Sequence, residues 1–177
     1  MRKVALVFAG GVGSRMNSKA RPKQFLEIHG KPIIVHTIEQ FENHPEIDDV
    51  CVVIVEAWLD YMRSLVKKFH LTKVKWVLAG GDSALSSQYN GLSAIAAAQD
   101  CTKEDIVLIH DGVRPLINEQ LISDCIASVK TFGSAVTVAP ATETIVQTNE
   151  NGESVNTIPR KECQLARAPQ CFYLKDI

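Results

Sequence analysis

The chain has 177 residues, of which 46% are hydrophobic and 22% are charged, and its formal net charge is -1. This length and composition are typical of one soluble globular domain with a sizeable core. The chain shows no clustered excess of Lys and Arg, which argues against a nucleic acid or a membrane surface as partner. The first apolar run has only six residues, 4–9, before glycine, which is too short for a signal peptide or a membrane span.

The five cysteines are scattered along the chain, and none stands in Cys-x-x-Cys spacing. Their odd number and their spacing argue against a disulfide framework or a zinc site and favour a reducing compartment. Cys51 lies inside an apolar run, where an inert buried thiol is expected. The sequence therefore predicts a cytoplasmic protein.

Short apolar runs alternate with amphipathic segments along the chain. The runs typical of buried strands cover residues 4–8, 50–55, 74–78, 106–110 and 135–139. The segments with helical spacing cover residues 33–41, 58–69, 87–98 and 119–129. Such alternation indicates βαβ units, so we expect an α/β, Rossmann-like fold whose mainly parallel sheet has helices on both faces.

Residues 140–160 interrupt this alternation. Two β-like runs at 144–148 and 154–158, with a turn at 149–152, predict a β-hairpin. In a doubly wound domain such a hairpin often projects as an arm, so we expect a homodimer contact through it. A surface flap on a monomer agrees with the pattern equally well.

A glycine-rich loop follows the first predicted strand, and two cations, Arg15 and Lys23, follow with no carboxylate between them. The N–H groups of glycines can approach phosphate oxygens closely and hold them. This combination indicates a triphosphate site. The structural alternative is a plain turn with two solvated surface cations.

Two common nucleotide loops are not matched by these glycines. Gly11 and Gly13 could open a dinucleotide fingerprint, but Met16 stands where the third glycine should be, and no acidic strand end follows about 20 residues on. No Gly-Lys-Ser/Thr follows, which excludes a Walker loop. An NAD-dependent oxidoreductase is therefore disfavoured.

Unusual residues also follow two other predicted strands. Gly80-Gly81-Asp82 comes after the third and Asp111-Gly112-Val113-Arg114 after the fourth. Ligands of open α/β sheets bind at this carboxyl edge, so we expect these segments and the glycine loop to share one site. The alternative for Asp111 is that it merely caps a turn.

Together these motifs resemble the signature of CTP-dependent cytidylyltransferases that act on small polyol phosphates. The matching segments are Ala9-Gly10-Gly11-x-Gly13-x-Arg15-Met16, Pro22-Lys23-Gln24-Phe25-Leu26, His110-Asp111-Gly112-Val113-Arg114-Pro115, Glu143-Thr144-Ile145-Val146, Ile158-Pro159-Arg160 and Pro169-Gln170. The resemblance covers the whole chain and implies a fold similar to nucleotide-sugar pyrophosphorylases. It also implies that a polyol phosphate oxygen attacks the α-phosphorus of CTP and that pyrophosphate leaves.

The resemblance implies roles for individual residues. The cations that would stabilise the transition state are Arg15 and Lys23. The residues that would bind the nucleotide are Ala9, Gly10, Gly11, Gly13, Gly81, Asp82 and Ser87. Those that would bind the polyol phosphate are Asp111, Arg114, Thr144 and Arg160, the last two on an arm lent to the partner subunit. Mg²⁺ is expected to arrive with the CTP phosphates, with Asp111 as its one protein ligand.

The identity of the polyol substrate is predicted from a residue of the 140–160 arm, Val146. Val146 follows Thr-Ile, where ribitol 5-phosphate enzymes of surface-polysaccharide synthesis tend to carry Val and 2-C-methyl-D-erythritol 4-phosphate enzymes of isoprenoid biosynthesis tend to carry Lys. We therefore expect ribitol 5-phosphate first and the erythritol phosphate second. Gln164 and Ala168 depart from an aromatic residue and a threonine usual in the family, both on the polyol side.

Members of this family continue beyond the position of Ile177. We therefore expect residues 1–177 to form a single, C-terminally truncated nucleotidyltransferase domain that includes the 140–160 arm. The alternative function is a non-catalytic nucleotide-binding domain, or an inactive fragment of a larger fusion enzyme.

Overall fold

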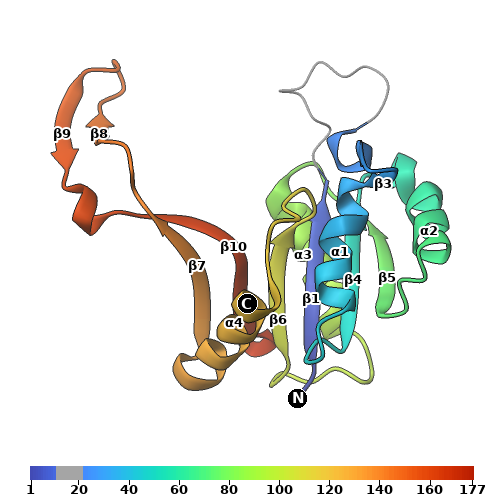
Figure 1. Ribbon diagram of the computed structural model, residues 1–177. Coiled ribbons are helices and arrows are strands. Elements are labelled where there is room, and N and C mark those ends of the chain that lie inside the picture. The colour runs from blue at the N-terminus through green and yellow to red at the C-terminus, as the bar shows by residue number, and fades with distance from the viewer. Residues whose placement is uncertain (11–21) are drawn as a thin grey trace.

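The computed structural model describes residues 1–10 and 22–177. A six-stranded sheet lies at its centre, in the order β5-β4-β1-β6-β10-β7 (Figure 1). Its strands are β1 (Lys3–Ala9), β4 (Asp49–Ile54), β5 (Val74–Ala79), β6 (Ile106–Asp111), β7 (Ser134–Pro140) and β10 (Gln164–Tyr173). The first four are parallel neighbours, and β10 pairs antiparallel with both β6 and β7. The mainly parallel sheet is confirmed.

Helices cover both faces of the sheet, as predicted. They are α1 (Ile33–Glu42), α2 (Leu59–Lys68), α3 (Ala84–Ala96) and α4 (Glu119–Phe132). One buried cluster joins α1, α2 and α4 to Ala5 and Val7 of β1, and a second joins α3 to Val4 and Leu6. Side chains of a strand alternate between the faces, so a continuous apolar run fills both clusters.

Helix α3 packs closely on the sheet, as its small residues predict. A Cβ at Gly91 would lie 2.4 Å from Leu6 Cδ1 and 2.9 Å from Val53 Cγ2. The helix begins at Ala84, three residues before the predicted start at 87. The reason is a capping box, in which the hydroxyls of Ser83 and Ser86 each accept from the other residue's backbone N–H.

Strand β10 was not predicted. Proline lacks a backbone donor and is rare inside a sheet, so Pro169 argues against a strand. The structure accommodates it with a register shift between Ala166 and Gln170 in the pairing with β7. The carbonyl of Pro169 accepts from Thr137 Oγ1 at 2.8 Å.

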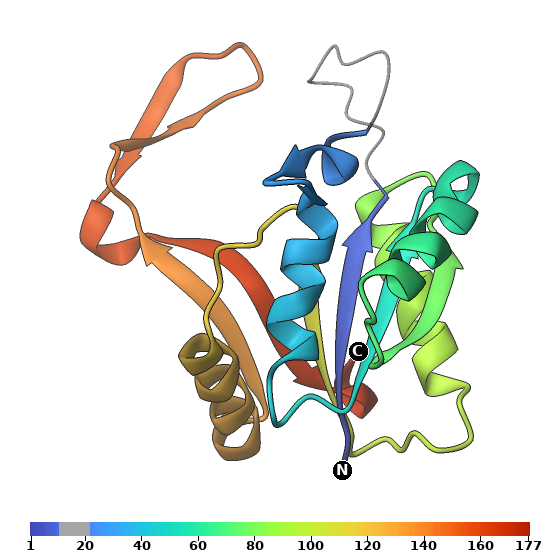
Figure 2. The ribbon, with the colours of Figure 1, turned by 45° about the vertical axis from the view of Figure 1, so that its right-hand side comes forward.

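The predicted hairpin is confirmed as β8 (Ile145–Thr148) paired with β9 (Ser154–Ile158). It extends from the ends of β7 and β10 as an arm, apart from the main sheet (Figures 1 and 2). A second, short hairpin consists of β2 (Glu27–Ile28) and β3 (Lys31–Pro32).

All five cysteines lie in the described residues and form no disulfide. Cys51 is fully buried, and burial raises the pKa of its thiol to about 12, which agrees with the predicted inert side chain. Among the described residues, every helix is too short or too polar to cross a membrane.

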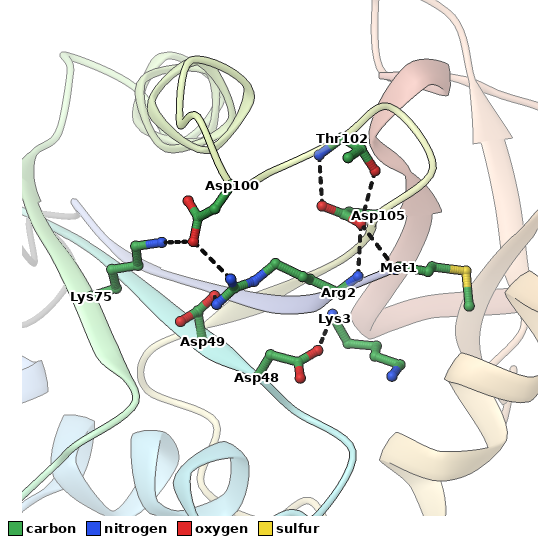
Figure 3. Close-up of polar contacts among 9 residues, drawn as sticks. All are labelled: Met1, Arg2, Lys3, Asp48, Asp49, Lys75, Asp100, Thr102 and Asp105. Carbon is green, nitrogen blue, oxygen red and sulfur yellow. Dashed lines mark hydrogen bonds and ion pairs between the residues drawn. The ribbon is translucent and has the colours of Figure 1, made fainter.

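Charged residues form ion pairs with one another at the amino edge of the sheet, where the parallel strands begin (Figure 3). The guanidinium of Arg2 contacts Asp49 and lies 2.7 Å from Asp100 Oδ2, and the ammonium of Lys75 contacts the same Asp100 oxygen. Asp105 is 1% exposed. Its carboxylate accepts from Arg2 N at 2.7 Å. It also accepts from the N–H and the hydroxyl of Thr102, at the start of the turn that precedes β6, at 2.8 and 3.1 Å.

Candidate active site

At the opposite edge, the carboxyl end of β1 is fastened to the segment that carries Lys23. Gln24 is 1% exposed, and its Nε2 donates to the carbonyl of Ala9 at 3.0 Å. The ring of Phe25 is fully buried, with centroids 4.9 Å from Trp58 and 5.0 Å from Tyr61. These contacts hold the short 3-10 helix Lys23–Phe25 against the end of β1 on one side and against Trp58 and Tyr61 on the other.

Ser87 packs the first glycine loop against the one that follows β5. A Cβ at Gly10 would lie 2.5 Å from Ser87 Oγ, and one at Gly80 would lie 2.7 Å from it. The fully buried Ser87 hydroxyl donates to Ser83 O at 2.8 Å and accepts from Gly81 N at 3.1 Å. Positions 10 and 80 therefore both require glycine, which has no Cβ. The structure therefore brings Gly10, where the first predicted loop begins, next to the loop after β5, and exposed Asp82 follows that second loop.

The turn after β6 lies against the same strand end. Asp111 is level with Phe8 of β1, and Gly112 N donates to Phe8 O at 2.9 Å. One Asp111 oxygen accepts from Val113 N at 3.1 Å, and the other lies 3.3 Å from Arg114 Nε. Asp111 therefore caps the turn and also contacts Arg114, whose side chain is 53% exposed.

Two buried polar side chains support this turn and were missed as site residues. His110 Nε2 donates to Arg114 O at 3.0 Å, and Thr37 Oγ1 donates to Gly112 O at 3.0 Å. Burial lowers the pKa of His110, which keeps its imidazole neutral. The available signal was a histidine directly before Asp111 at the end of an apolar run. Thr37 gave no signal, because its contact lies 75 residues away in sequence.

Thr144 and Arg160 lie on the arm and are exposed. Arg160 Nη1 donates to Thr142 O at 3.0 Å, within the base of the arm. The structure does not bring them to the strand ends of their own chain (Figure 2). Gly11, Gly13 and Arg15 lie outside the described residues, so the expectation that Arg15 and Lys23 act on the same phosphates stays a prediction.

Within the described ranges, residues 1–10 and 22–177, no group of three or more His, Cys, Asp or Glu side chains could hold a metal ion. Asp111 stands as a single carboxylate at the turn. Mg²⁺ commonly takes one or two protein carboxylates together with phosphate oxygens and water, so a lone aspartate suits an ion that arrives on a nucleotide.

Known proteins are similar to this chain in sequence and in architecture. Residues 3–177 match the family model described as IspD: 2-C-methyl-D-erythritol 4-phosphate cytidylyltransferase. A ribitol-5-phosphate cytidylyltransferase from Streptococcus agalactiae serotype V is 55% identical over 100% of this chain and 73% of its own length. A 2-C-methyl-D-erythritol 4-phosphate cytidylyltransferase from Syntrophus aciditrophicus is 36% identical over 98% of this chain and 72% of its own.

The fold is likewise shared with solved structures. The crystal structure of 4-diphosphocytidyl-2C-methyl-D-erythritol synthase from Anaerococcus prevotii superposes with a TM-score of 0.80 at 24% identity, covering 98% of this chain and 70% of that one. This likeness confirms the α/β architecture, and the sequence matches confirm the resemblance. The chain belongs to the IspD family of cytidylyltransferases, and it is a nucleotidyltransferase.

Proposed function

We propose that the protein joins CTP to ribitol 5-phosphate, giving CDP-ribitol and pyrophosphate. The observation that carries the proposal is the convergence of Gly10, Gly81, Lys23 and the Asp111–Arg114 turn on the end of β1. The polyol is favoured by the higher identity to a ribitol-5-phosphate enzyme, 55% against 36% for the erythritol-phosphate enzyme. Val146, exposed on β8, supports the same choice.

The triphosphate of CTP would lie over the loops that Ser87 packs together. Gly10 and Gly80 both lie against Ser87 Oγ, where neither could carry a Cβ, so no side chain of theirs covers the backbone there. Lys23, on its fixed 3-10 helix, would place a positive charge where charge accumulates on the α-phosphate as pyrophosphate departs. Transfer of this kind depends on alignment and charge, which rigid placement supplies.

The phosphate of the polyol would be held at the turn after β6. The Nε of Arg114 contacts Asp111, and its two Nη groups can form a bidentate pair with phosphate. Asp111 orients this guanidinium and presents a carboxylate oxygen to a polyol hydroxyl. The turn would thereby aim a phosphate oxygen at the α-phosphorus.

Mg²⁺ is proposed as the accompanying ion, with Asp111 as the side chain of this chain that would hold it. When bound with the nucleotide, the ion would neutralise part of the charge of the triphosphate. The chain's own residues would still orient the substrates: Lys23 lies on the 3-10 helix held at the end of β1, and Arg114 lies in the turn that follows Asp111.

The arm is proposed to contact a second copy of the chain, where Thr144 and Arg160 would reach the polyol phosphate. Two observations support this: the arm projects from its own sheet (Figure 1), and it exposes the apolar side chains of Val146 and Val155, 45% and 58% accessible. Removing such side chains from water favours association. The five free cysteines agree with a cytoplasmic location.

Pyrophosphate release with CTP and each polyol phosphate tests the proposal. We expect release with ribitol 5-phosphate and a lower kcat/KM with 2-C-methyl-D-erythritol 4-phosphate. The reverse preference would overturn the substrate. CTP binding by calorimetry without release in either case would favour the non-catalytic nucleotide-binding domain instead. Sedimentation of the protein tests the dimer separately.

A further inference from the structure

We propose that Thr37 and His110 are positioning residues that set where Arg114 meets the phosphate of the second substrate. The inference rests on the proposed function, because it takes the turn after β6 as the polyol phosphate site. Neither side chain needs to touch the substrate. Both are fully buried, at 0% exposure, and both act on backbone carbonyls of the turn.

The turn has few attachments to the rest of the fold. Asp111, the last residue of β6, binds the turn through Val113 N, Arg114 N and Arg114 Nε. Among the described residues, three further hydrogen bonds join Gly112–Arg114 to residues other than Asp111. Gly112 N donates to Phe8 O at 2.9 Å, Thr37 Oγ1 donates to Gly112 O at 3.0 Å, and His110 Nε2 donates to Arg114 O at 3.0 Å. Two of the three therefore come from side chains.

Thr37 reaches the turn from α1. Its hydroxyl also lies 3.2 Å from Ile33 O of its own helix, a common local contact of helical threonines. The bond to Gly112 O is different, because it crosses from one element to another. Since Gly112 is buried, its carbonyl would have no water to replace this donor.

His110 is the more informative of the two. A carbonyl can only accept, so Nε2 carries the hydrogen, and Nδ1 is left as a buried atom without a hydrogen-bond partner in the described structure. The edge of the ring packs against Phe41, with centroids 5.3 Å apart. An unsatisfied buried nitrogen costs stability. Packing alone would thus be served better by an apolar ring, and the bond to Arg114 O accounts for the histidine.

The test compares His110→Phe and Thr37→Val with two matched controls. His110→Phe keeps an aromatic ring against Phe41 and removes the donor and the unpaired nitrogen, and Thr37→Val removes the hydroxyl at nearly constant volume. The controls lose the same kinds of contact elsewhere. His44→Phe removes a buried histidine whose Nε2 lies 3.2 Å from Glu119 O, and Thr131→Val removes a helical hydroxyl bonded to Ala127 O.

We expect the KM for ribitol 5-phosphate to rise about tenfold in His110→Phe and in Thr37→Val, with the KM for CTP changed less than about twofold. Thr37→Ser, which keeps the hydroxyl, should restore most of the loss. Both controls should keep the wild-type KM values. Urea unfolding and circular dichroism establish that each variant is folded, and His110→Phe should be at least as stable as the Thr37→Val variant.

Arg114→Ala separates the two levels of the proposal. If it raises the KM for ribitol 5-phosphate while folded His110→Phe and Thr37→Val do not, the positioning roles are wrong and the proposed function stands. An equal rise in the KM for CTP would also overturn the inference, because it would indicate general distortion. If Arg114→Ala leaves the KM for ribitol 5-phosphate unchanged, the assignment of this turn to the polyol phosphate fails.

Discussion

The two edges of the parallel sheet treat charge in opposite ways. At the amino edge, Arg2, Asp49, Lys75 and Asp100 form linked ion pairs with one another (Figure 3). At the carboxyl edge, Arg114 pairs with Asp111, whereas Lys23 has no ion-pair partner among the described residues. The cations of the amino edge are thus paired within the chain, and the proposed function assigns the charge of Lys23 to a ligand.

The backbone differs between the edges as well. The carboxyl edge brings loops into contact through glycines, with Ser87 within 2.7 Å of the positions that side chains of Gly10 and Gly80 would occupy. The amino edge is held by ion pairs and by a buried carboxylate, that of Asp105, which accepts from the N–H groups of Arg2 and Thr102. The difference teaches that substitutions at the amino edge should change stability, whereas those at the carboxyl edge should change binding and turnover.

Lys23→Ala is the strongest test at the carboxyl edge. If the ammonium acts mainly on the transition state, turnover should fall by roughly 100-fold or more while CTP still binds. Pyrophosphate release measures the first and calorimetry the second. Lys67→Ala, an exposed lysine of α2, is the matched control and should leave both unchanged. Wild-type turnover in Lys23→Ala would remove the proposed role.

Asp105→Asn is the corresponding test at the amino edge. In the wild type both carboxylate oxygens accept hydrogen bonds. The amide of Asn puts an NH₂ donor in place of one of them, so this donor would face the donors of Arg2 or Thr102 in a buried site. We expect the free energy of unfolding to fall by about 2 kcal/mol in urea titrations, with KM values unchanged in the folded protein. Asp60→Asn, whose side chain is 97% exposed, should have little effect. A lower turnover at unchanged stability in Asp105→Asn would contradict the division between the edges.

Gly10→Ala probes the close approach of the two loops. The new Cβ would lie 2.5 Å from Ser87 Oγ, which cannot move without losing its bonds to Ser83 and Gly81. We expect a cost of about 1–2 kcal/mol, seen chiefly as a KM for CTP raised about tenfold. A Ser87→Ala background should reduce the cost, because the Ser87 Cβ lies at 3.4 Å. An undiminished cost in that background would show that the contact is not its cause.

The sequence was sufficient where one local signal dominated. The apolar run of β4 and the helical spacing of α4 each predicted the correct element, and the turn at 149–152 predicted the arm. Ends of elements were less accurate: α4 continues to Phe132, until Gly133 in the left-handed region with a φ of 89° ends it.

The parts that escaped prediction depend on contacts distant in sequence. Strand β10 contains Pro169 and is a strand because it fills the space between β6 and β7. The site motifs could be named from the glycines and charges, but the support from Thr37 and Gln24 could not. Each of these two side chains donates to a carbonyl on another element, and such bonds leave no periodic signal in the sequence.

Acid should reduce the advantage in stability that the wild type holds over Asp105→Asn. Burial raises the pKa of Asp105, but hydrogen bonds from Thr102 and Arg2 outweigh it and hold the pKa below its ordinary value of 3.8. The unfolded chain thus takes up the proton more readily than the folded one. The carboxylate's contribution is fully present above about pH 5 and is lost as the pH falls through the folded pKa.

We expect urea unfolding to give the same difference between wild type and Asp105→Asn at pH 7 and near pH 5, and a smaller one near pH 3. Other carboxylates titrate in both proteins, so the difference isolates Asp105. Because only part of this contribution is lost at pH 3, the change is the smallest of those expected here. A constant difference from pH 7 to pH 3 would mean that the neutral acid binds Thr102 and Arg2 as well as the carboxylate does, and that charge contributes little at the amino edge.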